Sequence, residues 1–208
     1  MKKIIFCDIP MKKEKDMHAM IYAGTGNTNC NYSKPVIFAI NTVLAETLKK
    51  DDEVRVILLR TLDKAGNSGR NSGLFMQELD TINLEIGAKI SYETLDSEFK
   101  ETKDIHEIRL KEMLDKIEEN TEIYADITYG PKPLPMILMC VISFAEKFLN
   151  CEVKSVLYGK VDFDDNNKPC NPELYDVTSL YYLNNLTSSM VADNGKDARQ
   201  SLNEFFSL

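Results

Sequence analysis

Several features that define common classes of enzyme are scarce or missing in this chain of 208 residues. It has two histidines and five cysteines, and no two cysteines show the Cys-x-x-Cys spacing typical of a zinc site. Histidine-based metal catalysis and a disulfide framework are therefore unfavoured, and we expect neither a metal nor a cofactor. Ser, Cys and His form no triad-like arrangement. Cys7 and Cys140 lie in apolar segments, and we expect both to be small core residues. Scattered aspartates such as Asp63, Asp80 and Asp162 fit a solvated surface better than a metal site.

Long hydrophobic runs are missing as well. The longest, from Leu134 to Ala145, is shorter than the roughly 20 residues that a membrane-spanning helix needs. The N-terminus has the lysines of a signal peptide, but Asp8 follows the apolar residues Ile4 to Cys7 at once. We therefore expect a cytoplasmic protein without membrane association.

The net charge of −8 argues against a general surface for DNA or RNA, whose footprint is basic. We expect no long nucleic acid to bind. A small anionic ligand in a locally positive pocket remains compatible with this charge.

Strands and helices are expected to alternate along most of the chain. Apolar, β-branched segments predict strands at 2–8, 54–59, 88–95, 122–128 and 153–161, and helical spacing predicts helices at 35–48, 75–86, 105–117 and 135–149. This alternation predicts an α/β fold: a Rossmann-like open parallel sheet with helices on both faces, in a single domain. Its core covers 1–163, and 164–208 is a C-terminal extension of the same domain.

Three further segments give local expectations. The stretch from Asp63 to Gly73 holds three glycines and two serines, so we expect a mobile loop. Residues 174–186 fit a strand or a short helix, and 198–206 fit a terminal helix.

The helix at 136–148 is apolar nearly all round, whereas a helix covering one face of a sheet should keep a polar outer side. We therefore expect it to bury a second surface. A second copy of the chain would supply that surface most simply, and the C-terminal segment is the alternative.

The segment Asp126-Ile127-Thr128-Tyr129-Gly130-Pro131-Lys132-Pro133-Leu134-Pro135 is the most informative candidate site. A strand runs into a glycine, a lysine and three prolines, and an apolar helix follows. Helix N-termini bind anions, and ligands of open α/β sheets lie beyond the carboxyl ends of the strands. The segment therefore indicates a site for a phosphorylated ligand, with a plain strand-to-helix turn as the alternative.

Two other segments are weaker candidates. Gly24-Thr25-Gly26 resembles part of a dinucleotide fingerprint but lacks the third glycine. It fits a flexible loop that offers donors to a phosphate, or a plain turn. Arg60 and Thr61 close the second strand at its carboxyl end, where Arg60 could pair with a phosphate, stack on a base, or form a strand-end salt bridge.

Together these residues resemble the CARF family (CRISPR-associated Rossmann fold). The family pattern at the end of the fourth strand is Asp-aliphatic-Thr-His-Gly-aromatic-Arg-x-aliphatic-Pro, and residues 126–135 follow it closely. Further matches are Leu157-Tyr158-Gly159, the later Tyr175-Asp176-Val177-Thr178-Ser179-Leu180, and the terminal Gly195-Lys196-Asp197-Ala198-Arg199.

The resemblance implies a homodimeric sensor of cyclic oligoadenylate, the second messenger of type III CRISPR antiviral signalling, with the ring lying across the two-fold axis. We expect cyclic tetra-adenylate, with cyclic hexa-adenylate as the other ring size. The implied ligand contacts are Gly24, Thr25, Gly26, Asn27, Arg60, Thr61, Asp126, Thr128, Tyr129, Gly130, Pro131, Lys132, Leu134 and Pro135. In these implied roles Lys132 would hold phosphates and Tyr129 would stack on a base.

Some CARF proteins cut their ligand slowly without a metal, so a stand-alone ring nuclease is the alternative function. Lys132 would then stabilise the developing charge, with Thr128 or Thr25 assisting. This chain departs from the family at Tyr129 for His, Lys132 for Arg and Pro131 for an aromatic residue.

The resemblance also bears on possible partners. Most family members carry an effector domain, so we expect either a fused or separate effector or a protein that works alone. A generic Rossmann enzyme using another nucleotide is a third, weaker hypothesis.

Overall fold

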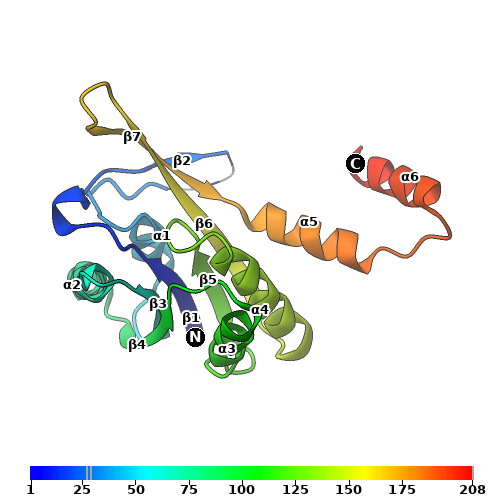
Figure 1. Ribbon diagram of the computed structural model, residues 1–208, viewed down its shortest axis with the longest axis horizontal. Coiled ribbons are helices and arrows are strands. Elements are labelled where there is room, and N and C mark those ends of the chain that lie inside the picture. The colour runs from blue at the N-terminus through cyan, green and yellow to red at the C-terminus, as the bar shows by residue number, and fades with distance from the viewer. Residues whose placement is uncertain (27, 29, 208) are drawn as a thin grey trace. The chain divides into compact units, whose positions relative to one another are not determined.

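The computed structural model describes residues 1–26, 28 and 30–207. The chain divides into two compact units, Met1–Thr178 and Ser179–Leu208. All seven strands described belong to the first unit, which is an α/β domain (Figure 1). Its elements are β1 (Lys2–Ile9), the 3₁₀ turn η1 (Glu14–Asp16), β2 (Ala23–Thr25), α1 (Ile40–Thr47), β3 (Glu53–Leu62), α2 (Asn67–Ile86), β4 (Lys89–Glu98), α3 (Lys103–Leu114), β5 (Glu122–Asp126), α4 (Leu134–Phe148), β6 (Glu152–Phe163) and β7 (Pro169–Asp176).

The strands form one open sheet in the order β2-β7-β6-β5-β1-β3-β4. Strands β6, β5, β1, β3 and β4 are parallel, β7 is antiparallel to β6, and β2 is parallel to β7. Numbered by their order along the chain, the parallel strands are arranged 3-2-1-4-5, which is the order of a Rossmann-like sheet. The predicted fold class is therefore confirmed, and so are all five predicted strands.

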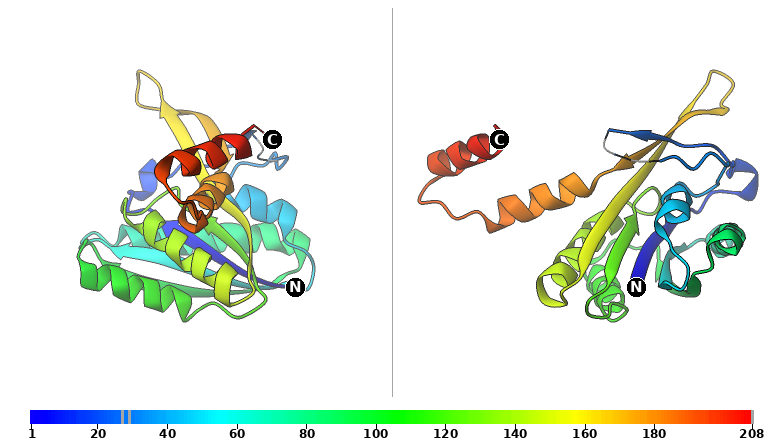
Figure 2. Two further views of the ribbon diagram at one scale, coloured as in Figure 1. Left: turned by 90° about the vertical axis from the view of Figure 1, so that its right-hand side faces the viewer. Right: turned by 180° about the vertical axis from the view of Figure 1, so that it is seen from behind.

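Helices cover both faces of the sheet, with α1 and α2 on one face and α3 and α4 on the other (Figures 1 and 2). The central strands β1 and β3 carry long apolar runs because both of their faces are largely buried. Ile5, Cys7 and Leu58 point into the core beneath α1 and α2. Cys7 is thus a core residue, as expected.

Helix α2 corrects the prediction of a mobile loop at 63–73. The helix begins at Asn67, and the Asp63 carboxylate caps it by accepting hydrogen bonds from the amides of Asn67 and Ser68 at 3.2 and 2.9 Å. The Asn71 side chain is buried and donates to the carbonyl oxygens of Pro10 and Lys12. The glycines here are tolerated because capping and burial offset their low helix propensity.

The predicted helix at 35–48 begins later, at Ile40. The amides of Ile37 and Phe38 donate instead to the Glu78 carboxylate of α2, at 2.6 and 3.1 Å. A side chain from a distant part of the sequence therefore takes the place of the first helical turn.

The ambiguous stretch at 174–186 contains both a strand and a helix. β7 ends at Asp176, and α5 (Thr178–Ser189) follows. Within the second unit, α6 (Gly195–Phe205) begins three residues before the predicted start, because the Asn194 side chain caps it by accepting from the amides of Lys196 and Asp197.

Helix α4 buries one side and exposes an apolar stripe on the other. Leu138, Val141 and Ala145 are buried. The stripe consists of exposed residues that recur every four positions and therefore line one face: Met136, Cys140, Phe144 and Phe148. The prediction that Cys140 is a core residue is therefore wrong. Among the described residues, no helix is long and apolar enough to cross a membrane.

Candidate ligand-binding site

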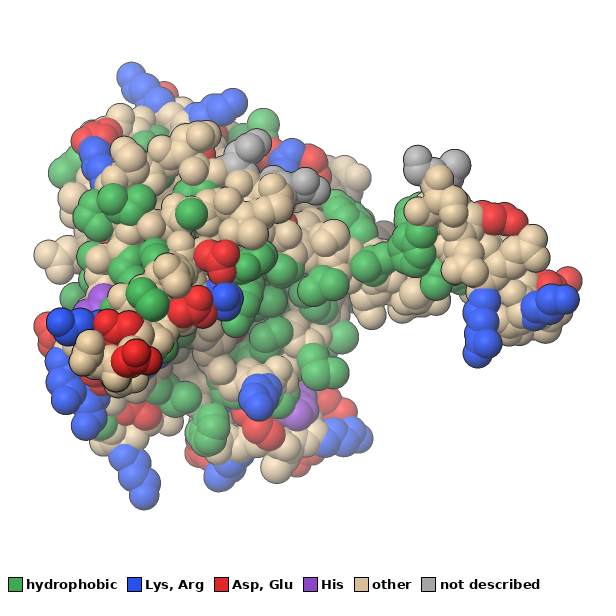
Figure 3. Space-filling view, turned by 90° about the horizontal axis from the view of Figure 1, so that it is seen from above, with side chains coloured by type: hydrophobic (Ala, Val, Ile, Leu, Met, Phe, Trp, Pro, Cys, Tyr) green, Lys and Arg blue, Asp and Glu red, His purple; other side chains and the backbone are tan. Residues whose placement is uncertain are grey.

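The candidate site lies at the carboxyl ends of β1, β5 and β6, where the order of the sheet reverses. β1 is followed along the chain by strands on one side of it, β3 and β4, and later by strands on the other, β5 and β6. Ligands of open α/β sheets bind at such a reversal, beyond the carboxyl ends of the strands. Figure 3 looks onto this side of the compact unit, where the Lys and Arg side chains in view are scattered rather than gathered in one patch.

The turn Asp126-Ile127-Thr128 closes β5 by hydrogen bonding inside the protein. The Thr128 amide donates to Asp126 Oδ1 at 2.9 Å, and the Thr128 hydroxyl donates to the same oxygen. The amide of Gly159 on β6 donates to the Thr128 hydroxyl at 2.8 Å. A hydroxyl has one proton and two acceptor lone pairs. Thr128 can therefore accept one more hydrogen bond from a ligand, but its proton is already committed.

Asp126 is fully buried, and this burial sets its acidity. Desolvation raises the pKa of Asp126 to about 6, although the hydrogen bonds from Thr128 and from the Cys7 thiol act in the opposite direction. Its neighbour Cys7 also has a raised pKa because it is buried beside this carboxyl group. Asp126 is therefore placed beneath the site, where it holds the turn, rather than at its surface.

A second turn repeats this arrangement on the far side of β6. In Asp176-Val177-Thr178, the Thr178 amide donates to Asp176 Oδ1 at 2.9 Å and the Thr178 hydroxyl donates to the same oxygen. The amide of Val156 on β6 donates to the Thr178 hydroxyl at 2.8 Å. Two Asp-x-Thr turns, one after β5 and one after β7, therefore hold β6 through its own backbone.

Gly159 is required where the first turn meets β6. A Cβ atom at this position would lie 2.8 Å from the Cβ of Ala39 and 3.3 Å from the side chain of Thr128. Any larger residue would push β6 away from Thr128, so the glycine of the Leu157-Tyr158-Gly159 motif serves this close approach.

Asp8, at the carboxyl end of β1, is a residue that was not predicted as part of the site. Its side chain is fully buried, and among the described residues neither carboxylate oxygen has a hydrogen-bond partner. Burial, together with the nearby Asp126, raises the pKa of Asp8 well above its usual range, while Arg109 acts in the opposite direction. The signal that could have revealed it is an acidic residue directly after the apolar run Ile4 to Cys7.

Gly130 lies directly against Asp8. It has a φ of +86°, and a Cβ atom there would lie 3.0 Å from Asp8 Oδ2 and 3.2 Å from Leu134. The Gly130 turn thus forms the cover over the buried carboxyl group, and both its backbone conformation and its lack of a side chain are needed.

The N-terminus of α4 offers fewer amide donors than expected from the sequence. Pro131, Pro133 and Pro135 have no amide hydrogen, and the amides of Leu134 and Met136 donate to the carbonyl oxygens of Pro131 and Pro133. The Lys132 side chain is exposed, and no described residue pairs with it. A positive charge at this helix end would therefore come from the Lys132 ammonium more than from the backbone.

Tyr129 is largely packed into the core next to Cys7 and Tyr22, and burial raises the pKa of its hydroxyl. The Lys12 ammonium lies 5.4 Å from the centre of its ring. Stacking a base on this face of Tyr129 would require Lys12 to move aside.

Arg60 and Thr61 lie two strands away from Asp126, on β3. The Arg60 guanidinium donates to both carboxylate oxygens of Asp96, its register neighbour on β4, while Thr61 is buried. The strand-end salt bridge that the sequence left open is therefore formed.

Gly24, Thr25 and Gly26 lie toward the opposite edge of the sheet. Gly24 and Thr25 belong to β2, which pairs with Leu174 and Tyr175 of β7, and Gly26 follows with a φ of +68°. Three strand spacings separate Gly24 from Thr128, about 14 Å along the sheet. Asn27 lies outside the described residues.

The structure thus brings together the consecutive residues from Asp126 to Pro135 and adds Asp8 and Gly159 to them. It separates this group from Arg60 on one side and from Gly24 on the other. A ligand touching all three segments would have to span about 24 Å, which is five strand spacings.

A cavity of about 320 Å³ lies at the opposite ends of the strands, beside the amino ends of β1, β3 and β4. Its charged lining is largely paired internally: Lys2 with Glu118 at 2.6 Å, and Arg55 with Glu93 and Glu118 at 2.7 and 3.3 Å. Because parallel sheets bind ligands at the carboxyl ends of their strands, we assign the candidate site to the Asp126–Pro135 edge.

No protein-family model matches the chain, and no curated protein matches it at a significant level. The residues and geometry of the carboxyl edge are therefore the basis on which a function is assigned.

Proposed function

We propose that this protein is a CARF-type sensor domain that binds cyclic oligoadenylate, with cyclic tetra-adenylate as the favoured ring. One observation carries the proposal: three of the four segments of the sequence resemblance come together around β6. Thr128 from the first motif is bonded to Gly159 from the second, and Thr178 from the third is bonded to Val156. A shared architecture explains why residues so far apart in the sequence match together.

The chemistry of the carboxyl edge suits a phosphorylated ring. Lys132 supplies a cation beside the Gly130 turn that no described residue pairs, and the remaining lone pair of Thr128 can accept from a ribose hydroxyl or an adenine amino group. Together with Lys12 over the Tyr129 ring, this is still a small charge for a ligand with several phosphates. A two-fold dimer with the ring on its axis would place two copies of Lys132 against it.

The exposed stripe on α4 supports the dimer. Met136, Cys140, Phe144 and Phe148 present an apolar face, and the rings of Phe144 and Phe148 lie 4.8 Å apart. A second copy of the same face would bury these side chains in a self-complementary contact. Because α4 begins at the Lys132 turn, the same contact would bring two copies of the candidate site close together.

The alternative function is a metal-independent ring nuclease. In that reaction a ribose 2′-oxygen attacks the adjacent phosphorus, the bond from phosphorus to the 5′-oxygen breaks, and the 2′-proton ends on the released 5′-hydroxyl. The exposed ammonium of Lys132 favours this candidate, because it could stabilise the charge that develops on the phosphate. Thr128 could assist only as an acceptor, since its own proton is bonded to Asp126.

The experiment is to incubate the purified protein with cyclic tetra-adenylate or cyclic hexa-adenylate and to follow its melting temperature and the ligand by chromatography. A ligand that binds only the native state adds about 2.7 kcal/mol of stability at a hundred times its Kd. Stabilisation by a ring that stays intact would support the sensor. Linear products would support the nuclease, and neither effect with either ring would refute both.

Lys132→Ala tests the site itself. We expect weaker binding, or lost cleavage, because this variant removes the exposed cation at the start of α4. Lys103→Ala is the matched control, since Lys103 is an exposed lysine on α3. Equal loss in both variants would mean that overall charge, not the site, governs binding.

A further inference from the structure

A pair of tyrosines occupies the carboxyl edge between the two segments that the sequence indicates as ligand contacts. Tyr158 on β6 and Tyr175 on β7 are register partners, and their ring centres lie 6.5 Å apart with the ring planes inclined by 37°. Tyr158 is 40% exposed although its strand lies inside the sheet. A large aromatic side chain that is open to solvent next to a candidate site offers a face on which a flat ligand can rest.

The backbone register places this pair in the row that connects the candidate segments. Gly159, next to Tyr158, donates to the Thr128 hydroxyl, and Tyr175 is the register partner of Thr25. Running across the sheet, the row is therefore Thr128, the two tyrosines and Thr25. The tyrosines bridge a gap that neither predicted segment covers by itself.

The pair also lies on the same face of the sheet as α4. The backbone of Gly159 faces Ala39, next to α1, and successive residues of a strand point to opposite faces. Tyr158 therefore projects from the face that α4 covers, and α4 begins beside Lys132. A phosphate held by Lys132 and a base resting on Tyr158 would be approached from one side.

Charged neighbours hold the Tyr175 ring in place. Its hydroxyl donates to Glu173 Oε2 at 3.0 Å, and the same oxygen pairs with Lys160 at 3.1 Å. Lys160 pairs in turn with Asp162 at 3.2 Å. A ring fixed in this way loses little freedom when a flat ligand settles on the pair, which favours binding.

We propose that Tyr158 and Tyr175 form a stacking surface for an adenine base of the ligand, with Tyr158 as its exposed face. The inference deepens the proposed function and rests on it for the identity of the ligand. Aromatic rings hold bases through their faces, and loss of one such ring commonly weakens binding by about 5- to 150-fold. A purely structural pair would instead only join β6 to β7.

The first test uses the lack of tryptophan in this chain. Tyr158→Trp introduces a single indole whose fluorescence a stacked adenine would quench. Phe99→Trp is the control. Phe99 is exposed and directly follows β4, the strand at the opposite edge of the sheet from β2. Each variant is titrated with cyclic tetra-adenylate and, separately, with millimolar adenosine monophosphate.

Quenching by cyclic tetra-adenylate in Tyr158→Trp but not in Phe99→Trp would support both the stacking surface and the ring ligand. The same difference with adenosine monophosphate alone would support the stacking surface and count against the ring ligand. If neither ligand quenches Tyr158→Trp more than Phe99→Trp, the inference is overturned.

A second measurement separates stacking from folding. Tyr158→Phe keeps the ring and should bind within about twofold of the unmodified chain, whereas Tyr158→Leu should bind about 5- to 150-fold more weakly. Melting temperatures of the free variants identify any general loss of structure. If Tyr158→Leu retains full affinity for a ligand that the unmodified chain binds, the stacking role is refuted while the proposed function stands.

Discussion

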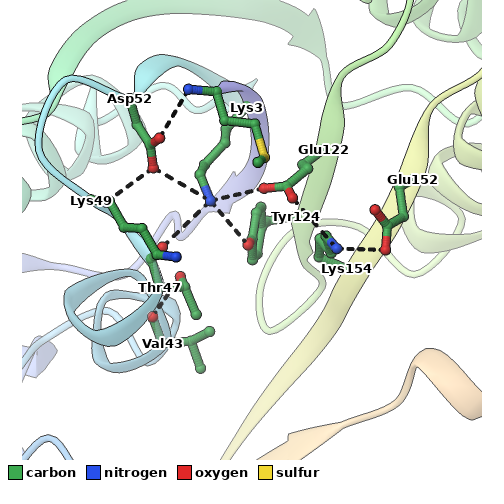
Figure 4. A network of polar contacts seen from close by, with 10 residues as sticks. Lys3, Val43, Thr47, Lys49, Asp52, Glu122, Tyr124, Glu152 and Lys154 are labelled. Atoms are coloured by element: carbon green, nitrogen blue, oxygen red, sulfur yellow. Dashed lines mark hydrogen bonds and ion pairs between the residues drawn. The ribbon is translucent and has the colours of Figure 1, made fainter.

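Both ends of β1 bury a charged side chain, and the two ends treat it differently. At the carboxyl end, the Asp8 carboxylate is fully buried without a partner among the described residues. At the amino end, the Lys3 ammonium lies 2.8 to 3.5 Å from four oxygen atoms (Figure 4). They belong to the carboxylates of Glu122 and Asp52, the hydroxyl of Tyr124 and the carbonyl group of Thr47. The same strand therefore buries two ionisable side chains. Lys3 has ion-pair and hydrogen-bond partners, whereas the Asp8 carboxyl group has none among the described residues.

The pKa shifts express this contrast. Burial lowers the pKa of Lys3, but its carboxylate and tyrosine neighbours outweigh burial, and the net shift is upward, toward the charged form. Burial raises the pKa of Asp8 with no comparable compensation, so the neutral form is favoured. A satisfied buried charge identifies a structural site, whereas an unsatisfied one identifies a place for function.

Removing the Lys3 ammonium should have the largest effect on the difference between the two ends of β1. Lys3→Met should destabilise the protein by about 3 kcal/mol, because Asp52 and Glu122 would lose their buried cation and keep only the N-terminal amino group and Lys154 as partners. Urea unfolding measures this change. Lys2→Met is the control, since the Lys2–Glu118 pair is exposed and should matter little. Equal stability of both variants would mean that the Lys3 network contributes nothing.

At the carboxyl end, the titration of Asp126 predicts how the stability of the protein changes with pH. Its folded pKa of about 6 exceeds the ordinary value of 3.8, so the folded state binds the proton more tightly than the unfolded state. Its contribution to stability is complete below about pH 4 and is lost as the pH rises through 6, a change of about 3 kcal/mol.

Asp126→Asn keeps the acceptor for Thr128 and removes this titration. Unfolding curves between pH 4 and pH 7 should therefore be flatter for the variant than for the unmodified chain. Parallel curves would show that Asp126 does not titrate in this window.

Asp8→Asn should stabilise the protein at neutral pH by about 2 kcal/mol, because a neutral amide replaces a carboxyl group whose ionisation is suppressed by burial. Thermal unfolding at pH 7 measures the gain. Asp176→Asn provides the comparison, since Asp176 is hydrogen bonded by Thr178 and by Ser155 at 3.2 Å. Destabilisation by Asp8→Asn would mean that the ionised form is bonded in the folded protein.

Gly130→Ala sharpens the description of the cover over Asp8. We expect a loss of about 1 kcal/mol, from the positive φ and from the new methyl group against the carboxyl oxygen. In the background of Asp8→Ala, part of that loss should disappear, and a double-mutant cycle measures the coupling. Strict additivity would show that Gly130 and Asp8 do not contact one another.

The sequence was sufficient to predict the parallel core. The runs at 4–7 and 54–59 are apolar because both faces of their strands are largely buried, so local pattern and tertiary environment agree. The segment Asp126–Pro135 was identified for the same reason, since its turn chemistry is local.

Features fixed by distant partners could not be predicted in this way. The start of α1 depends on Glu78, which is 41 residues from Ile37 along the chain, and this bond leaves no periodic signal. The cap of α2 by Asp63 is local, but the glycines that follow it concealed the helix. The apolar outer side of α4 was expected from the sequence, but the residues that form it were not, because an apolar residue such as Cys140 looks the same in a sequence whether it is buried or exposed. Asp8 is a single residue at the end of a strand, and its isolation is visible only once the surrounding elements are placed.

The two Asp-x-Thr turns are connected to one another through the backbone of β6. Gly159 and Val156, whose amides hold Thr128 and Thr178, are three residues apart on an extended strand, about 10 Å. An extended strand can neither stretch nor shorten appreciably, so it keeps the distance between the two turns nearly constant. A displacement of the Thr128 turn along β6 would therefore also move Thr178, where α5 begins, and with it the buried side chains of Val156 and Leu157.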